Sequence, residues 1–306
     1  MIVRDRPSLL RLFFIVRGSV VVRIYPQLLL VFALACLVVA LHRGYPGSVP
    51  AMSSAPFSLL GMALSIFLGF RNNASYDRWW EARKDWGQLI TTLRDFARQT
   101  QLLPDTPEGQ AQRRALLQPC MAFAHLLVDH LRPHAPRGKA TPWLPPELQR
   151  QLAASRNVPD LVLRHIGAQL AQLRRQQCIS DIEYSLLDAS IGRMSAVLAA
   201  CERIRNTPVP FGYTLLLHRT AYLFCFLLPF GFVDTLGWAT PFAATLVAYT
   251  FFGLDALGEE LEEPFGHRPN ALPIGTLADV IEINLREALG ETDLPPLPVP
   301  VDDLLT

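Results

Sequence analysis

Four apolar runs constrain most strongly what this chain can fold into. They cover about residues 24–41, 52–70, 220–236 and 239–257. A membrane span needs about 20 mainly apolar residues, and none of these runs is a clean stretch of that length, so buried helices of a soluble protein are an alternative. Half of the 306 residues are hydrophobic and 18% are charged. This composition lies between that of a soluble domain and that of a chain made only of spans, and predicts a few spans with a substantial aqueous part.

The basic residues lie on one side of these runs. Arginines precede the first run, and further basic residues follow the second run and precede the third. They are Arg4, Arg6, Arg11, Arg17, Arg23, Arg71, Arg78, Arg83, Lys84, Arg203, Arg205 and Arg219. The link between the first two runs carries only Arg43, and the link between the last two has no Lys or Arg. Because positive residues favour the cytoplasmic side, we expect four membrane helices with both termini and the long middle segment in the cytoplasm.

The runs divide the chain into five predicted parts. Residues 1–23 form an interfacial or cytosolic segment, whose spaced arginines suit the membrane surface or, alternatively, a soluble amphipathic helix. Residues 24–70 hold the first two membrane helices, and residues 71–218 form a cytosolic helical region. Residues 219–257 hold the last two membrane helices, and residues 258–306 form a cytosolic C-terminal helix and tail. The repeated arginines also argue against a secretory signal peptide at the start.

The cytosolic region is predicted to be mostly helical. Apolar residues recur at helical spacing between 182 and 198, whereas the proline-rich stretches 104–109 and 132–147 predict exposed loops. A last helix is expected at about 274–289. The following PPLPVP cannot pack by itself, and we expect it to be disordered or to lie along a partner.

Cysteines, histidines and net charge exclude several classes of site. The five cysteines are scattered without zinc-site spacing, which indicates reduced packing residues, and the net charge of +1 gives no reason to expect nucleic acid as a partner. His125 and His130 are five residues apart and do not share a helical face. His218, beside Arg219, indicates where the third run meets the cytosol rather than a ligand site. We therefore predict no cofactor and no metal.

Two stripes run along the second apolar run. Small residues form the first stripe and allow close approach of a neighbouring helix. They are Ser58, Gly61, Ser65 and Gly69. The second stripe consists of Met62, Ile66 and Phe70, each four residues apart. Either these side chains face lipid or the core, or copies of the helix surround an axis and the three residues line a narrow hydrophobic neck that gates ions by dewetting.

A dense polar segment, GFRNNASYDRWWEARKDWG, follows at residues 69–87. Its charged and amide residues form what we call the polar cluster, which is predicted to hold adjacent helices in register by hydrogen bonds and ion pairs. The polar cluster consists of Arg71, Asn72, Asn73, Asp77, Arg78 and Glu81. Asp77 and Glu81 share a helical face and could serve acid–base catalysis, but no nucleophile, metal spacing or phosphate loop accompanies them. The sequence therefore does not predict an enzyme.

Several stretches resemble the bestrophin family, especially its bacterial members. They are LGFRNNASYDRWWEARKDWGQLI, RIRNTPVPFGYTLLLHRTAYLF, LDALGEELEEPFG and, near the start, SLLRLFF. The resemblance implies an all-α membrane protein that assembles as a homopentamer around one pore in the bacterial inner membrane, with four membrane helices and a large cytosolic helical part in each subunit. It implies a channel for monovalent ions, with chloride passed by animal members and cations favoured by some bacterial ones. The sign of the ion stays open here, and membrane lipids are the other expected partner.

The resemblance also implies site residues. The pore neck of the family falls on Met62, Ile66 and Phe70. A cytosolic constriction, formed by isoleucine in bacterial relatives, makes Ile179 the candidate, with ordinary packing as the alternative. Animal relatives bind calcium through acidic residues after the PFG motif, but residues 267–270 read HRPN, which predicts no such site. The glutamates before that motif are expected to form a solvated face.

Two other classes of function remain as alternatives. One is a membrane-bound enzyme that acts on lipid head groups at the polar cluster. The other is a non-conducting membrane scaffold whose cytosolic helices bind partners. Only a channel passes current down an ion gradient without a substrate, so conductance discriminates between the three.

Overall fold

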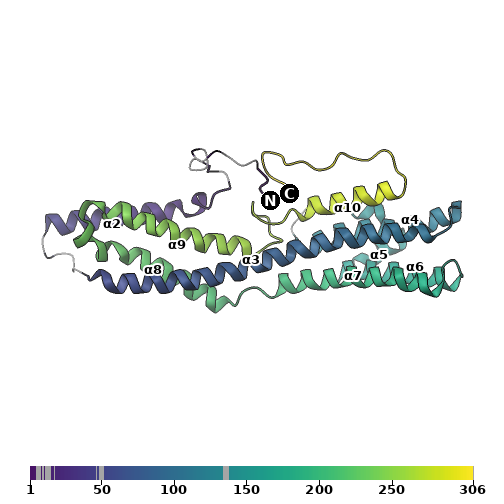
Figure 1. Ribbon diagram of the computed structural model, residues 1–306, viewed down its shortest axis with the longest axis horizontal. Coiled ribbons are helices and arrows are strands. Elements are labelled where there is room, and N and C mark those ends of the chain that lie inside the picture. The colour runs from purple at the N-terminus through teal and green to yellow at the C-terminus, as the bar shows by residue number, and fades with distance from the viewer. Residues whose placement is uncertain are drawn as a thin grey trace. The chain divides into compact units, whose positions relative to one another are not determined.

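The computed structural model describes residues 1–4, 8, 10, 15–16, 18–45, 47, 52–133 and 138–305, and the regular structure within these ranges is helical apart from isolated bridges (Figure 1). Much of the predicted interfacial segment, including residues 11–14, lies outside the described residues. The chain divides into two compact units. Unit 1 comprises Met1–Val3, Trp80–Thr207 and Phe265–Thr306, and unit 2 comprises Arg4–Trp79 and Pro208–Pro264.

Unit 2 contains the apolar helices. They are α2 (Val21–Gly44), the first part of α3 (Ser54–Gln99), α8 (Phe211–Leu236) and α9 (Thr240–Glu262), and a short 3₁₀ turn, η3 (Gly237–Ala239), joins the last two. Three continuous helical stretches of the described chain are long and apolar enough to cross a membrane: Val21–Gly44, Ser54–Leu102 and Phe211–Glu262. The third folds back on itself at η3, so the chain offers four helical segments, and the number of crossings stays a prediction.

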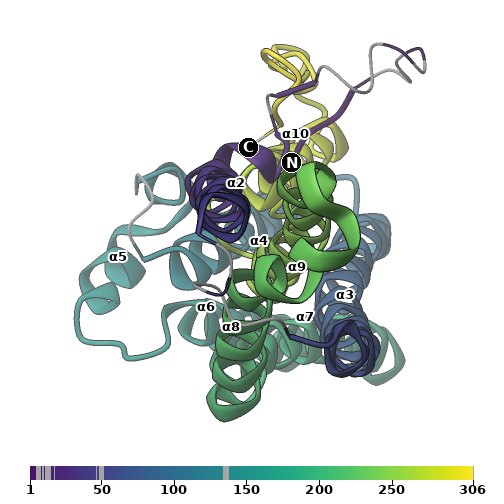
Figure 2. The ribbon, with the colours of Figure 1, turned by 90° about the vertical axis from the view of Figure 1, so that its left-hand side faces the viewer.

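Contacts between aromatic rings and polar side chains establish the directions of these helices. The rings of Phe224 and Phe251 lie 5.2 Å apart and those of Tyr222 and Phe252 lie 4.6 Å apart, which makes α8 and α9 an antiparallel hairpin. Helix α2 lies against both, as the end-on view in Figure 2 shows. Its Gln27 contacts Tyr222 near the middle of α8. Its His42 lies 3.0 Å from Asp234 near the end of α8, so α2 and α8 are parallel.

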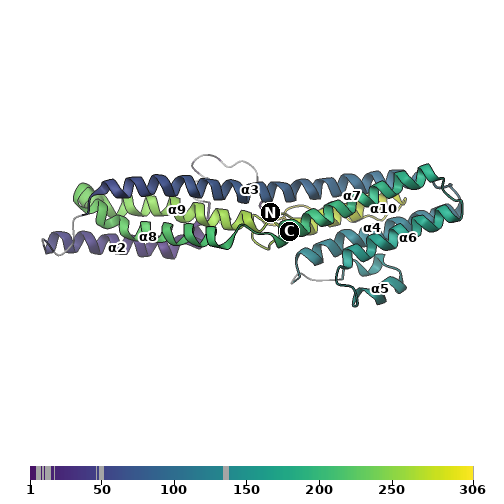
Figure 3. The ribbon, with the colours of Figure 1, turned by 90° about the horizontal axis from the view of Figure 1, so that it is seen from below.

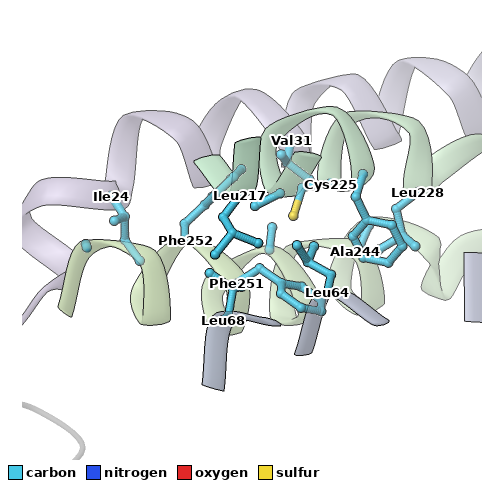
Figure 4. Packing of buried hydrophobic residues seen from close by; sticks show 14 of the residues in the cluster. Ile24, Val31, Leu64, Leu68, Leu217, Cys225, Leu228, Ala244, Phe251 and Phe252 are labelled. Carbon is cyan, nitrogen blue, oxygen red and sulfur yellow. The ribbon is translucent and has the colours of Figure 1, made fainter. Parts of the chain in front are cut away.

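The core of unit 2 is formed by apolar side chains from all four segments (Figure 4). Leu64 and Leu68 of α3 are buried in the same cluster as Val31, Phe224 and Phe251. This cluster contains no charged side chain. It stabilises unit 2 through close packing of apolar surface, and such packing does not depend on direction. Directional contacts between these helices therefore come from their polar ends.

Close approach of α3 and α8 depends on small residues. A Cβ atom at Gly61 would lie 3.1 Å from the ring of Phe224, so this member of the predicted small-residue stripe does pack against a neighbouring helix. A Cβ atom at Gly69 would meet nothing within 4 Å. Ser58 and Ser65 are exposed and donate their hydroxyls to backbone carbonyls of their own helix. The predicted stripe therefore serves helix packing at one position within the described chain.

Gly231→Ala is expected to destabilise unit 2, because a Cβ atom there would lie 2.5 Å from the ring of Phe57. Overpacking of this kind costs about 1–3 kcal/mol. Thermal unfolding of the purified protein in detergent measures the loss. Gly212→Ala is the matched control in the same helix, because its Cβ atom would meet nothing within 4 Å. Equal melting temperatures for the two variants would contradict the close approach of α3 and α8.

Unit 1 is a bundle of helices around α4 (Pro107–Leu131), whose residues from Leu116 to Val128 are almost all buried (Figure 3). Helices α6 (Val158–Arg175), α7 (Asp181–Asn206) and α10 (Ile274–Ala288) pack against it. The long helix α7 begins with a capping box. The Glu183 backbone amide donates to Ser180 Oγ and the Ser180 backbone amide donates to the Glu183 carboxylate, which satisfies amides that lack helical partners. The predicted helices at 182–198 and 274–289 are thus confirmed.

The predicted proline-rich loops are partly wrong. Pro107 begins α4 and Pro146 begins α5 (Pro146–Leu152), and a 3₁₀ turn covers Thr141–Trp143. Proline suits the first turn of a helix, because its missing N–H has no intrahelical partner there and its ring fixes a helical φ. Residues 134–137 of the second stretch lie outside the described residues.

The C-terminal tail is attached to the N-terminal residues at its end, and the predicted contact of PPLPVP with a partner stays a prediction. Residues 291–300 have no regular structure, but the end of the tail pairs with the first residues of the same chain. The Leu305 amide donates to the Met1 carbonyl at 2.8 Å, and the Val3 amide donates to the Asp303 carbonyl at 2.9 Å. Backbone groups without helical partners are thereby satisfied within unit 1.

Candidate functional site

The stripe of Met62, Ile66 and Phe70 lies on an exposed face of α3. These side chains are 64%, 52% and 61% exposed, whereas Leu64 and Leu68 of the same helix are buried in the core of unit 2. Side chains four residues apart share one helical face, so the three form a continuous apolar strip about two turns long. A strip of this kind needs lipid or another protein surface to cover it.

The polar cluster is divided between the two faces of α3. Asn73 and Asp77 continue the exposed face beyond Phe70, whereas Arg71 is only 1% exposed. Glu81, in unit 1, lies 2.5 Å from the Arg203 guanidinium of α7. The cluster therefore supplies both an exposed polar surface and contacts between helices.

Arg71 makes the most buried ion pair of unit 2 that the structure describes. Its Nη1 donates to the Asp255 carboxylate of α9, and its Nη2 lies 3.7 Å from the Glu262 carboxylate. Two turns further along α3, the Arg78 Nε donates to the Glu262 carbonyl at 3.3 Å. Asp255 also accepts a hydrogen bond from His218 of α8 at 2.7 Å. Three helices thus meet at one carboxylate, and sequence reasoning missed it because these residues are far apart in the chain.

The glutamates before the PFG motif form the predicted solvated face only in part, since Glu259 and Glu263 are exposed. Glu260 is buried, and Arg23 of α2 pairs with both Glu259 and Glu260. Glu262 lies beside Arg71, as described above. A charge run is usually solvated, but here it lies at the end of an apolar helix, where arginines of neighbouring helices can reach it.

Ile179 occupies a different environment from that expected of a pore constriction. Its side chain is only 4% exposed, in the turn that precedes α7. It precedes the N-cap residue Ser180, and Tyr184 stands at the position where a hydrophobic staple forms. Ile182, in the first turn of α7, is 75% exposed. The exposed isoleucine at this end of α7 is therefore Ile182.

A second buried polar group lies in unit 1 between α4 and α10. His125 is buried and its Nε2 lies 2.7 Å from Oε2 of Glu282, which also accepts a hydrogen bond from the Trp143 indole at 3.2 Å. Burial by itself raises the pKa of Glu282, but the His125 and Trp143 hydrogen bonds and the charge of Arg286 outweigh it and lower that pKa overall. These contacts join α4, α10 and the 3₁₀ turn Thr141–Trp143. The sequence spacing of His125 and His130 did not predict them.

Glu282→Gln is expected to lower the free energy of unfolding by about 1–3 kcal/mol near neutral pH, because a charged hydrogen-bond acceptor is lost at a buried site. The folded pKa of Glu282 lies below the ordinary value of 4.5. The carboxylate therefore stabilises the fold fully above that pH, and the stabilisation is lost as the pH falls through the folded pKa. Chemical unfolding at a series of pH values measures the difference between the two proteins.

Asp279→Asn is the matched control for Glu282→Gln. Asp279 lies on the same helix, and its pair with Lys139 is more exposed. Surface ion pairs contribute about 0–1 kcal/mol, so this variant should unfold almost like the parent protein. A difference between Glu282→Gln and the parent that stays constant down to strongly acidic pH would contradict the assignment.

The cysteines fit the predicted packing role in part. Cys120, Cys201 and Cys225 are buried, Cys178 is half-buried, and Cys36 is exposed on α2. Burial raises the pKa of the Cys120 and Cys201 thiols, which keeps them protonated and unreactive. Among the residues that the structure describes, no group of three or more His, Cys, Asp or Glu side chains could hold a metal ion.

Comparisons with known proteins give a consistent result over most of the chain. Residues 1–287 match the family model described as bacterial/fungal bestrophin protein. A voltage-dependent anion channel-forming protein of Mesorhizobium japonicum is 46% identical over 99% of this chain and 96% of its own length, and one of Escherichia coli K12 is 43% identical over 96% of each chain. A crystal structure of a bacterial bestrophin homologue from Klebsiella pneumoniae is similar with a TM-score of 0.83, at 39% identity over 88% of this chain and 99% of that one.

Proposed function

Because this chain belongs to the bacterial and fungal bestrophin family, we propose that it assembles into a membrane channel and that the channel passes anions. The family is one of channel-forming proteins and not of enzymes. The relatives are named as anion channel-forming proteins, which supports anions as the ions that pass. The exposed apolar stripe on α3 is the observation on this chain that supports a channel. In a symmetric oligomer, several copies of the chain can surround one route for ions, and each copy then presents the same surface to that route. The stripe is an exposed surface of unit 2 with a regular helical repeat, so it can serve as that surface.

The proposed assembly is a homopentamer in the bacterial inner membrane with both termini in the cytoplasm. In each subunit α2, the first part of α3, α8 and α9 cross the bilayer, and the five α3 helices surround one axis. Met62, Ile66 and Phe70 then form three stacked apolar rings, which make a narrow neck that is hard to wet. Asn73 and Asp77 follow on the same exposed face, where the neck opens to the cytosol.

The preference for anions is the finer part of the proposal. Apolar rings carry no fixed charge, so the neck itself distinguishes the sign of an ion weakly, and charges at its mouths supply the preference. Reversal potentials of the purified protein in planar bilayers under a chloride salt gradient test this directly. A potential near the chloride equilibrium value supports anion selectivity, and one near the cation equilibrium value would reject it while keeping the channel. Native mass measurement tests the pentamer.

Ile182 is proposed as the second constriction, at the cytosolic end of the pathway, in place of Ile179. Ile182→Ala is expected to change the single-channel current, because an exposed ring of isoleucines would be removed. Ile179→Ala is the control at the same turn, and since this side chain is buried it should lower stability rather than change the current of assembled channels. The reverse pattern in bilayer recordings would return the role to Ile179.

A further inference from the structure

Arg71 and Phe70 are adjacent on α3 and point in different directions. Phe70 belongs to the exposed stripe, whereas the Arg71 side chain is almost completely buried against α9. Successive side chains on an α-helix are about 100° apart around its axis, since a turn contains 3.6 residues. The rotation of α3 that buries the Arg71 guanidinium is therefore the rotation that exposes the Phe70 ring.

The buried face of α3 offers few directional anchors besides Arg71. Leu64 and Leu68 lie on the same face and contact the apolar core. Apolar contacts are non-directional and tolerate small rotations, whereas an arginine–carboxylate hydrogen bond has a defined geometry. Near the neck, the orientation of α3 therefore depends most on the Arg71–Asp255 pair.

Asp255 is itself held in place from a second side. One carboxylate oxygen accepts from Arg71, and the other lies 2.7 Å from Nδ1 of His218 on α8. The ring of His218 contacts the ring of Tyr222 on the same helix, with centroids 4.3 Å apart and planes tilted by 35°. A carboxylate that is fixed on both oxygens gives α3 a rigid point of attachment.

Gly258 lets α9 approach α3 at this level. A Cβ atom at position 258 would lie 2.3 Å from Oδ1 of Asn72 and 3.8 Å from Cζ of Arg71. That Asn72 oxygen is buried without a hydrogen-bond partner among the described atoms, as are Nε of Arg71 and Oγ of Ser75. Asn72 and Arg71 of α3 thus lie against a position of α9 that has no side chain.

We propose that Arg71, Asp255 and Gly258 are positioning residues of the neck, which fix the rotation of α3 so that Phe70 and Ile66 face the pore axis. The proposal rests on the proposed function of the stripe, but adds a cause for its orientation. Loss of the pair would let α3 turn, so that the neck changes its width without any change in the residues that line it. A purely structural ion pair would affect only stability and assembly.

The test uses a cysteine at Phe70 as a reporter of rotation. Phe70→Cys is made in a Cys36→Ser background, because Cys36 is the exposed native cysteine on α2. Assembled protein in liposomes is treated with a charged, water-soluble thiol reagent, and the rate of current change reports access of Cys at position 70 to the pore. Adding Asp255→Asn is expected to change this rate by at least about fivefold, the size of a modest coupling between two sites.

Arg23→Gln is the matched control for Asp255→Asn. It removes the ion pair between α2 and α9 and leaves the contacts of α3 intact, so the reagent should react with the reporter at the parent rate. An unchanged rate in Asp255→Asn, with subunits still assembled, would overturn the positioning role. A parent reporter that does not react at all would instead reject the neck assignment, which separates the two failures.

Gly258→Ala provides a second route if Asp255→Asn does not assemble. The added methyl group collides with Asn72, and the variant should alter the reporter rate in the same way. Asn72→Ala removes the colliding oxygen, so the double variant is expected to regain the parent rate. Failure of this rescue, with Gly258→Ala assembled and altered, would contradict the proposed contact between α9 and α3.

Discussion

Ile66→Ala is expected to raise the single-channel current of the assembled protein severalfold. Ile66 is the middle residue of the exposed stripe, and in the proposed assembly every subunit contributes one copy to the same ring. Removing three carbons from each copy widens the neck and lowers the cost of wetting it. A fall of about 1.4 kcal/mol in that barrier corresponds to a tenfold higher rate of ion passage. Recordings in planar bilayers at fixed salt and voltage measure the change.

Phe67→Ala is the matched control for Ile66→Ala. Phe67 is also a large, half-exposed apolar residue on α3, but it lies off the stripe, one residue further around the helix. Its replacement removes a larger side chain and should leave the unitary current near that of the parent protein. If Phe67→Ala raised the current and Ile66→Ala did not, the pore axis would lie on the other side of α3.

The sequence was sufficient to predict the helices and the exposed stripe because both depend on local spacing. Residues 274–289 and 182–198 carry an apolar repeat near 3.6, and α10 and α7 follow it closely. Met62, Ile66 and Phe70 are predicted to share a face by their spacing alone, and the structure leaves that face exposed. Their place at a pore remains a proposal, because a single chain does not show what covers them.

Contacts between distant segments could not be predicted in this way. The partner of Arg71 is Asp255, 184 residues further along the chain, and His218 reaches the same carboxylate from a third helix. The run of glutamates near the end of α9 predicted a solvated face. The burial of Glu260 could not be predicted, because it depends on which neighbouring helix lies beside it. Ile179 was a reasonable candidate by resemblance, and only its burial in the turn before α7 directs attention to Ile182.

Charge substitutions at Phe70 are expected to set the ion selectivity of the channel, in opposite directions. Phe70 is the exposed stripe residue nearest the polar segment of α3, where a charged side chain costs less than at the middle of a bilayer. Phe70→Arg would place a ring of positive charge around the pathway, which favours anions, and Phe70→Glu would favour cations. In the proposed pentamer every subunit adds one such charge, so the two reversal potentials should separate towards opposite limits, about 59 mV on either side of zero for a tenfold salt gradient.

Tyr76→Arg and Tyr76→Glu are the controls for this pair. Tyr76 is exposed on α3, six residues beyond Phe70 and off the stripe, so its charge variants should shift the reversal potential little. High salt provides a second check, because screening shortens the reach of the added charges and should bring the two Phe70 variants closer together. If both Phe70 variants still conduct and keep the parent reversal potential at low salt, this side chain does not line the ion pathway. The assignment of the neck to α3 would then be wrong. Opposite shifts at Phe70 that weaken with salt, and small ones at Tyr76, would instead show that one face of this helix lines the ion pathway.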